Sequence, residues 1–192
     1  PFSSRNVLKR ILELYRAEGL QPVIAPEVEF YLIEKNLDPD LALKPPVGRS
    51  GRPETARQSY SIDAANEFEP FVETMYSYSD AMGLDVDTLI HESGAAQLEV
   101  NFIHGDPLAL ADQVFTFKRM VRETALKHDI YATFMAKPMA TEPGSAKHIH
   151  QSVLSLKDGS NIFATPDGQY SEAFYQYLGG LQTYTPYVMS FF

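Results

Sequence analysis

The chain has 192 residues, 44% of them apolar, which is enough for one well-buried core without requiring a second. Its formal charge of −9 disfavours nucleic acid as a partner, because binding to phosphate backbones needs a basic surface. The lack of cysteine excludes disulfides and thiolate metal sites and fits a cytoplasmic location, and no apolar run is long enough to predict a membrane span.

The first third of the chain predicts a helix, a strand and a loop. A helix capped by Ser3 or Ser4 ends at Gly19, and a strand over about 21–34 follows. Residues 36–58 are rich in Pro, Gly and charge and predict a long surface loop.

Asp63 is expected to cap a second helix that continues to Gly83. The remaining predicted elements, in chain order, are a strand near 97–102, a helix from Asp106-Pro107 to about Lys127, a strand over 131–135, a strand over 148–156 with a turn at 157–160 that starts a hairpin toward Phe163, and a helix over 171–184. This mixed order predicts an α+β fold with a largely antiparallel, curved sheet.

Two glutamates one residue apart, Glu27 and Glu29, are expected to project from the same face of the first strand. Val28 and Phe30 would face the other way, toward helices. Because adjacent carboxylates repel, such a pair is stable only beside cations or hydrogen-bond donors. The pattern therefore predicts a polar, metal-binding face opposite an apolar one.

Two further predicted strands alternate in the same way. The polar positions are Gln97, Glu99 and Asn101 on one strand and His148, His150 and Ser152 on the other. An antiparallel sheet often has one solvent-exposed face, so a single strand with alternating polar residues does not by itself indicate a binding site. A generic wet face, however, favours lysine, arginine, serine and threonine, whereas these positions offer oxygen and nitrogen ligands that suit Mg²⁺ or Mn²⁺.

Other chemistries fit the sequence less well. The compact His-Glu-x-x-His zinc motif, a Gly-x-Ser-x-Gly nucleophile and a Walker-type loop are all missing. Two divalent ions in a carboxylate pocket can neutralise the oxygens of a nucleoside triphosphate during phosphoryl transfer. Binding of the phosphates would then fall to metals, His150 and basic residues.

Four segments resemble the catalytic domain of the glutamine synthetase family. Residues 25–30 resemble its strand with two metal-binding glutamates, and residues 91–99 resemble its His-Glu…Gly-Gln-x-Glu segment. Residues 134–138 and 144–150 are similar to its Phe-Met-x-Lys-Pro…Asn-Gly-Ser-Gly-Met-His-x-His segment. The match keeps the family's order over nearly the whole chain.

The resemblance implies roles for particular residues. One metal would be held by Glu29, Glu92 and Glu99, and a second by Glu27 and His148 with its third protein ligand beyond Phe192. Of these, Glu29, Glu92, Glu99 and His148 are assigned as catalytic. The implied substrate contacts are His150, Ser152 and Asp87 for ATP, and Gly144 for glutamate.

The implied reaction is the ATP-dependent ligation of the glutamate γ-carboxylate to an amine through γ-glutamyl phosphate. Two departures from the family pattern favour the γ-glutamylpolyamine or γ-glutamylputrescine synthetase branch, which uses an organic amine in polyamine and nitrogen metabolism. Pro143 replaces an asparagine that binds glutamate, and Lys147 replaces a methionine. Proline has no side-chain amide, so that hydrogen bond is lost.

The resemblance also implies that residues 1–192 are part of a catalytic domain. An N-terminal β-rich domain, which completes a neighbour's active site in a ring-shaped homo-oligomer, and the C-terminal part of the catalytic domain would be absent. We therefore expect the chain alone to be inactive. Three alternatives stay open: an ordinary ammonia-using glutamine synthetase, a non-catalytic structural or binding member of the family, and a plain divalent-metal-binding domain.

Overall fold

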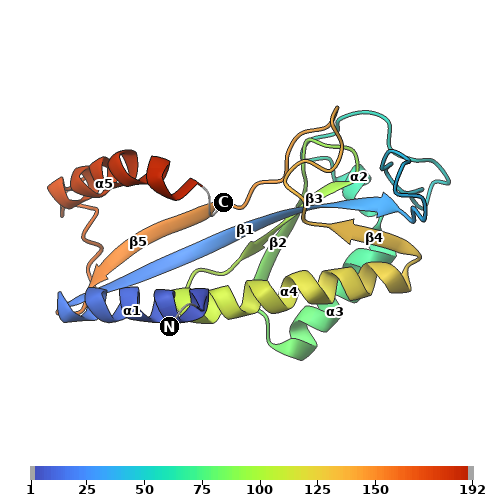
Figure 1. Ribbon diagram of the computed structural model, residues 1–192. Coiled ribbons are helices and arrows are strands. Elements are labelled where there is room, and N and C mark those ends of the chain that lie inside the picture. Colours follow the sequence, from blue (N-terminus) through green and yellow to red (C-terminus); the bar gives the residue numbers. More distant parts are fainter. Residues whose placement is uncertain (1–2, 190–192) are drawn as a thin grey trace. The chain divides into compact units, whose positions relative to one another are not determined.

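The computed structural model describes residues 3–189, which form two compact units. One unit contains the described residues up to Ile24, Asp106–Leu108 and the chain from Gln151 onward, and the other contains Ala25–Gly105 and Ala109–His150. The elements are α1 (Ser4–Ala17), β1 (Leu20–Glu34), α2 (Ile62–Asn66), α3 (Glu69–Met82), β2 (Val86–His91), β3 (Gln97–Phe102), α4 (Pro107–Lys127), β4 (Ile130–Thr133), β5 (Ile149–Ser155) and α5 (Glu172–Val188) (Figure 1).

The predicted α+β class is confirmed: the helices accompany an unclosed sheet in which β1 is antiparallel to β3 and β4, and β2 is antiparallel to β3. The strand order is β2-β3-β1-β4, and β5 also pairs with β1. The long strand β1 is thus the central element, and it belongs to both units. None of the helices in the described part of the chain is both long and apolar enough to cross a membrane.

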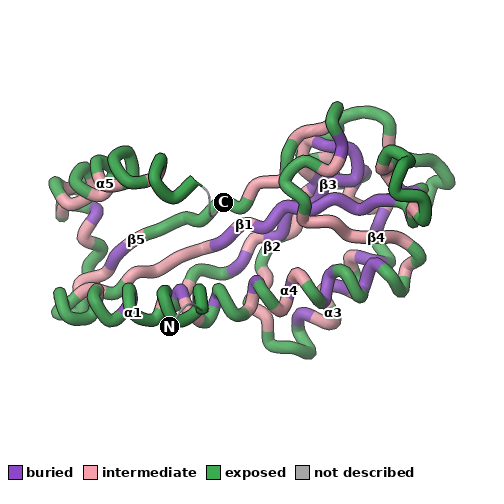
Figure 2. The backbone as a smooth tube through the Cα atoms, viewed as in Figure 1, coloured by how far each residue is buried: buried purple, intermediate pink, exposed green. Residues whose placement is uncertain are grey.

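An aromatic core covers the apolar face of the sheet in the second unit. Phe30 is completely buried, and its ring contacts Phe71 of α3, Phe117 of α4 and Phe134. In Figure 2 the buried positions of β1 concentrate in its part that belongs to the second unit, from Ala25 onward. Helices α3 and α4 therefore pack on the side of the sheet opposite the glutamates, as the alternation in the sequence predicts.

The single second helix expected from Asp63 to Gly83 is wrong in two respects. Ser61, not Asp63, caps α2, with its side chain accepting a hydrogen bond from Ala64 N. The helix is then interrupted before α3, where Pro70 occupies one of the first helical positions. Proline has no N–H for an i→i−4 bond, so it starts a helix more easily than it continues one.

Other differences concern strands and ends. The strand β2 was not predicted, because Asp87 and Thr88 interrupt its apolar alternation. The turn at 157–160 forms, but its return arm toward Phe163 makes only isolated bridges instead of a strand. The last helix, expected over 171–184, is capped by Ser171 and continues through Pro186 to Val188.

Candidate metal centre

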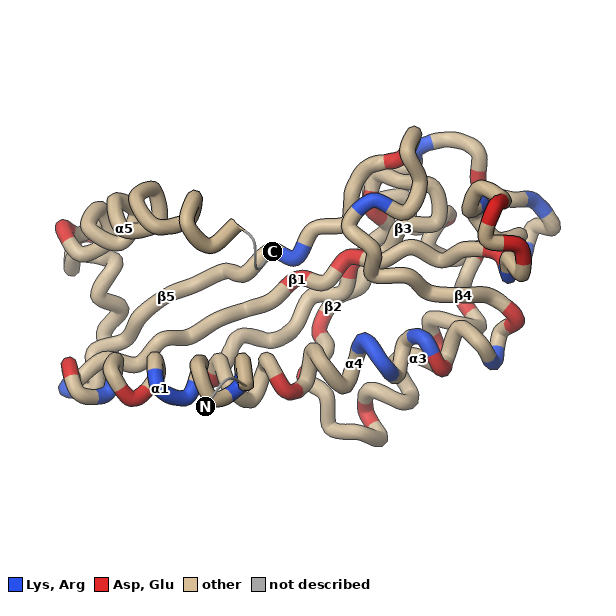
Figure 3. Tube along the Cα trace, viewed as in Figure 1, with Lys and Arg blue, Asp and Glu red and all other residues tan. Residues whose placement is uncertain are grey.

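The register between β1 and β3 brings the predicted polar residues together. Glu29 is paired directly with Glu99, and Glu27 is paired with Asn101. Directly paired residues of an antiparallel ladder project from the same face, so the carboxylates of Glu27 and Glu29 on β1 and of Glu99 on β3 meet there. Acidic positions appear on this part of β1 in Figure 3. The sheet thus builds the acidic face that the sequence predicts.

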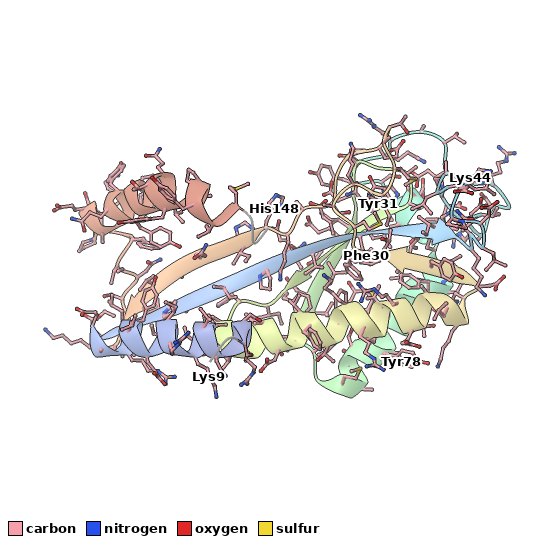
Figure 4. All side chains as sticks on the ribbon, viewed as in Figure 1. Lys9, Phe30, Tyr31, Lys44, Tyr78 and His148 are labelled. Carbon is pink, nitrogen blue, oxygen red and sulfur yellow. The ribbon has the colours of Figure 1, made fainter. Side chains whose placement is uncertain are left out.

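Three potential ligand atoms converge on this face. Glu27, Glu99 and His148 each offer an atom, and these atoms lie within 4.8 Å of one another. The Glu27 carboxylate lies between two imidazoles: Oε2 is 2.9 Å from His148 Nδ1, and Oε1 contacts His150 Nε2. Both histidine side chains are mainly exposed, whereas Glu99 is buried. Figure 4 labels His148 beside β1.

Glu29 is buried and firmly held by donors. Its Oε2 accepts hydrogen bonds from Gln97 Nε2 at 2.9 Å and from the Ala146 backbone N–H at 2.9 Å. Both of these contacts fall on one carboxylate oxygen, which leaves Oε1 available to a cation. The contact with Ala146 also ties the segment before β5 to β1.

Glu92 lies in the turn between β2 and β3, at the edge of this face. Its carboxylate accepts a hydrogen bond from the Ser93 N–H at 3.0 Å, and its backbone N–H donates to Gln97 O at 2.8 Å. The turn includes Ala96 with a positive φ of 57°, a conformation that costs a non-glycine residue energy. Glu92 is not one of the three converging ligands, so its role as a ligand remains a prediction.

A buried contact between Glu54 and His91 supports this turn. The Glu54 Oε2 lies 2.9 Å from His91 Nε2 and accepts the Ala96 N–H at 2.6 Å. The other ring nitrogen, His91 Nδ1, lies 2.8 Å from the Glu92 carbonyl oxygen. The His91 ring therefore lies between the Glu54 carboxylate and the backbone of the turn. The segment 36–58 is therefore not wholly a surface loop, since the side chain of Glu54 is only 6% exposed.

The carboxylates titrate differently because their surroundings differ. Burial, together with the charges of Glu27, Glu92 and Glu29, raises the pKa of Glu99 to about 6. Burial also raises the pKa of Glu29. Burial alone would raise the pKa of Glu27 as well, but hydrogen bonds and charges from His150 and His148 hold it below its ordinary value. Repulsion within the group favours binding of a cation.

This repulsion predicts a pH dependence of the metal-free protein. Between about pH 4.5 and 6 the folded chain holds a proton on Glu99 that the unfolded chain has released, so stability falls as pH rises through this window. The lowered pKa of Glu27 affects stability at more acidic pH, below about 4.5, where its contribution to folding stability is lost as pH falls. Melting temperatures measured in chelator should decline from pH 4.5 to 6.5, and saturating Mn²⁺ should abolish the decline. A melting temperature that rises throughout this range in chelator contradicts the burial of these charges.

The donor set fits a hard divalent cation. Carboxylate oxygens with one imidazole suit Mg²⁺ or Mn²⁺, and a bound cation would offset the repulsion between the carboxylates. The grouping of Glu99 with Glu27 and His148 differs from the two ligand sets expected from the sequence, in which Glu99 is placed with Glu29 and Glu92. The assignment of each carboxylate to a particular ion remains a prediction.

The segment expected to bind glutamate borders this face. Gly144 O accepts a hydrogen bond from Gln97 Nε2 at 3.0 Å, and a Cβ on Gly144 would lie 2.9 Å from the Ala136 carbonyl oxygen. The Pro143 carbonyl accepts from the Tyr31 hydroxyl at 2.7 Å. Burial and the charge of Lys118 on α4 lower the pKa of Lys147. Lys147 thus lies within electrostatic range of Lys118 on α4.

Two predicted residues are not brought into this group. Asp87 is an exposed residue of β2, and Tyr76 OH lies 3.4 Å from its backbone oxygen. Ser152 belongs to the other compact unit. Their contacts with ATP therefore stay predictions.

Sequence reasoning missed two contributors, Tyr31 and Glu54. Tyr31 continues the 27, 29, 31 alternation and so shares the glutamate face, opposite Phe30 (Figure 4). This alternation is visible in the sequence and could have identified Tyr31. No local signal marks Glu54, because its burial depends on the distant residues His91 and Ala96.

The fold and the site together define an α+β domain in which an antiparallel sheet presents carboxylates and imidazoles on one face, a donor set that fits a divalent cation. The chain belongs to the glutamine synthetase family: residues 2–192 match the family described as glutamine synthetase, catalytic domain. Members of this family are ATP-dependent ligases that join glutamate to ammonia or an amine and use divalent metals.

Curated relatives of two kinds are similar to the chain. The γ-glutamylputrescine synthetase PuuA of Escherichia coli K12 is 35% identical over 189 residues, which cover 97% of this chain and 40% of the relative. A glutamine synthetase of Pyrococcus horikoshii is 37% identical over 177 residues, which cover 92% of this chain and 37% of the relative. The chain thus spans about two fifths of the length of these relatives.

Solved structures agree with the fold. The structure of apo GmaS without ligand gives a TM-score of 0.80 at 31% identity, covering 94% of this chain and 41% of that one. Plasmodium falciparum glutamine synthetase also gives a TM-score of 0.80, and at 21% identity it supports the fold alone.

Proposed function

We propose that the protein containing this chain is a cytoplasmic, ATP-dependent ligase that joins the γ-carboxylate of glutamate to an organic amine such as putrescine. The observation that carries the proposal is the convergence of Glu27, Glu99 and His148 within a chain of the glutamine synthetase family. A descendant that had lost catalysis would have no reason to keep buried, mutually repelling carboxylates, since these cost stability without a cation. The non-catalytic alternative is therefore disfavoured.

The residues of the face would hold two ions, Mg²⁺ or Mn²⁺, through Glu27, Glu29, Glu92, Glu99 and His148. Bound there, divalent ions supply charge neutralisation between anionic glutamate and the triphosphate. Glu29 and Glu99 are fixed by Gln97, Ala146 and Asn101, so they need little reorganisation. His150, held by Glu27 in this structure, would contact phosphate oxygens when ATP is bound.

The proposed reaction has two steps. A γ-carboxylate oxygen of glutamate attacks the γ-phosphorus of ATP, and ADP leaves. The amine nitrogen then attacks the acyl carbon of γ-glutamyl phosphate, inorganic phosphate leaves and the nitrogen loses a proton. Gly144 would orient glutamate through its backbone, while Ser152 and Asp87 would contact the nucleotide.

The choice of an organic amine rests on Pro143 and Lys147 and on the similarity to γ-glutamylputrescine synthetase PuuA. The glutamine synthetase of Pyrococcus horikoshii has comparable identity, so an ordinary ammonia-using enzyme is the second candidate. We further propose that residues 1–192 form the central part of the catalytic domain of a ring-shaped homo-oligomer, since the relatives are more than twice as long.

The test is ADP release by the full-length protein with glutamate, ATP and Mg²⁺, comparing ammonia with putrescine and with smaller amines. We expect turnover with an organic amine and little with ammonia, and no turnover by the 192-residue chain alone. Efficient use of ammonia would instead favour the second candidate. No ADP release with any amine, despite bound metal, would overturn the ligase proposal.

A further inference from the structure

Tyr31 occupies a central position between the metal face and the segment that precedes β5. Its ring is fully buried, and its hydroxyl lies 2.7 Å from the Pro143 carbonyl oxygen and 3.1 Å from Gln97 Oε1. A phenol has one hydrogen to donate, and the shorter distance favours Pro143. The hydroxyl therefore fastens to β1 the segment where this chain departs from the family pattern.

Gln97 connects the next residue of that segment, Gly144, to a candidate metal ligand. Its amide nitrogen donates to Glu29 Oε2 at 2.9 Å and to Gly144 O at 3.0 Å, and its oxygen accepts the Gly94 N–H at 2.9 Å. The side chain is 1% exposed, so water does not replace these partners freely. One buried amide thus holds Glu29 and Gly144 in fixed relation, because each of its polar ends is used.

Packing leaves the phenol little freedom. Tyr31 forms a buried cluster with Ile33 and Met139. On the other side, a Cβ on Gly94 would lie 1.9 Å from the Tyr31 hydroxyl oxygen and 2.6 Å from its Cζ. Close approach of the backbone at Gly94 therefore confines the ring, and the hydroxyl cannot turn away without moving the 92–97 turn.

We propose that Tyr31 is a positioning residue that, with Gln97, couples the glutamate-binding backbone at Pro143 and Gly144 to the metal ligand Glu29. The coupling rests on the proposed function, because it assigns these two places to glutamate and to a cation. The Pro143 carbonyl accepts from Tyr31 and the Gly144 carbonyl accepts from Gln97, so the backbone at 143–146 takes one orientation relative to Glu29. Loss of the hydroxyl releases the Pro143 carbonyl and loosens both binding places together.

The experiment is Tyr31→Phe in the full-length enzyme, which removes one oxygen and keeps the ring. We expect the KM for glutamate to rise about tenfold and the Kd for Mn²⁺ several-fold, as one lost buried hydrogen bond permits. The KM for ATP should change less than twofold. The matched control is Tyr78→Phe on α3, which also loses a hydroxyl contact, the one with Lys127 Nζ, and should leave all three constants unchanged.

A merely structural role for Tyr31 would lower the melting temperature without separating the two KM values. If Tyr31→Phe folds and both the KM for glutamate and the Kd for Mn²⁺ stay within twofold, the proposal is overturned. If Tyr31→Phe does not fold, Gln97→Glu removes the donors to Glu29 and Gly144 with nearly unchanged shape. This variant must then raise the KM for glutamate and the Kd for Mn²⁺ while the KM for ATP changes less than twofold. Absence of turnover by the wild type counts against the proposed function, whereas the Mn²⁺ comparison still decides the coupling.

Discussion

Replacing Glu99 with glutamine should lower kcat of the full-length protein at least about 1,000-fold while making the metal-free protein more stable. Activity falls because Glu99 is one of the three converging ligands, and an uncharged amide binds a divalent ion poorly. Stability rises because the variant no longer buries a charge whose pKa is raised to about 6. These opposite signs separate a metal ligand from a structural carboxylate.

Both effects can be measured on the same preparation. Steady-state ADP release reports kcat, and thermal melting in chelator and in Mn²⁺ reports stability with and without the cation. Wild-type protein should gain stability from Mn²⁺, and Glu99→Gln should gain much less. The matched control is Glu123→Gln on an exposed position of α4, which should change neither quantity. A Glu99→Gln protein that keeps both its activity and its Mn²⁺ stabilisation would exclude Glu99 as a ligand.

Gly94→Ala should destabilise the protein by about 3 kcal/mol or more and remove most of its activity. The new methyl carbon would lie within bonding distance of a buried hydroxyl, and the Tyr31 ring has no space to move into. The turn that carries Glu92 must shift instead, and Gln97 loses its contact with the Gly94 N–H. Chemical denaturation gives the loss of stability, and ADP release gives the loss of activity.

Gly179→Ala is the matched control for this substitution. Gly179 lies inside α5, and apart from its chain neighbours and the adjacent helix backbone no atom lies within 4 Å of the position of its added Cβ. Alanine favours the helix over glycine by up to about 1 kcal/mol, so this variant should be neutral or slightly more stable. If Gly94→Ala is tolerated as well as Gly179→Ala, then the contact between Gly94 and Tyr31 does not constrain the site.

The residues of the glutamate face could be predicted because their alternation along each strand follows from a period of two. Glu27 and Glu29 alternate with Val28 and Phe30, and the same pattern recurs over 97–102, so the strands carry their chemistry in the sequence. The start of α4 could also be predicted, because the Asp106-Pro107 signal for a helix N-terminus depends only on neighbouring residues.

The features that could not be predicted depend on distant residues. The burial of Glu54 is produced by His91 and Ala96, about 40 positions away, and the break between α2 and α3 depends on whether Pro70 continues or restarts a helix. β2 lacks a clean alternation of its own and is defined by its pairing with β3. Which carboxylates share an ion is likewise decided by strand register, not by spacing along the chain.

The most direct test of a divalent-metal centre on this face is anomalous diffraction from crystals of the full-length protein grown with Mn²⁺. The account predicts manganese bound by Glu99 together with Glu27 and His148, with a second ion at Glu29. Manganese peaks only at other places, with Glu27 still hydrogen-bonded to His148 and His150, would contradict it.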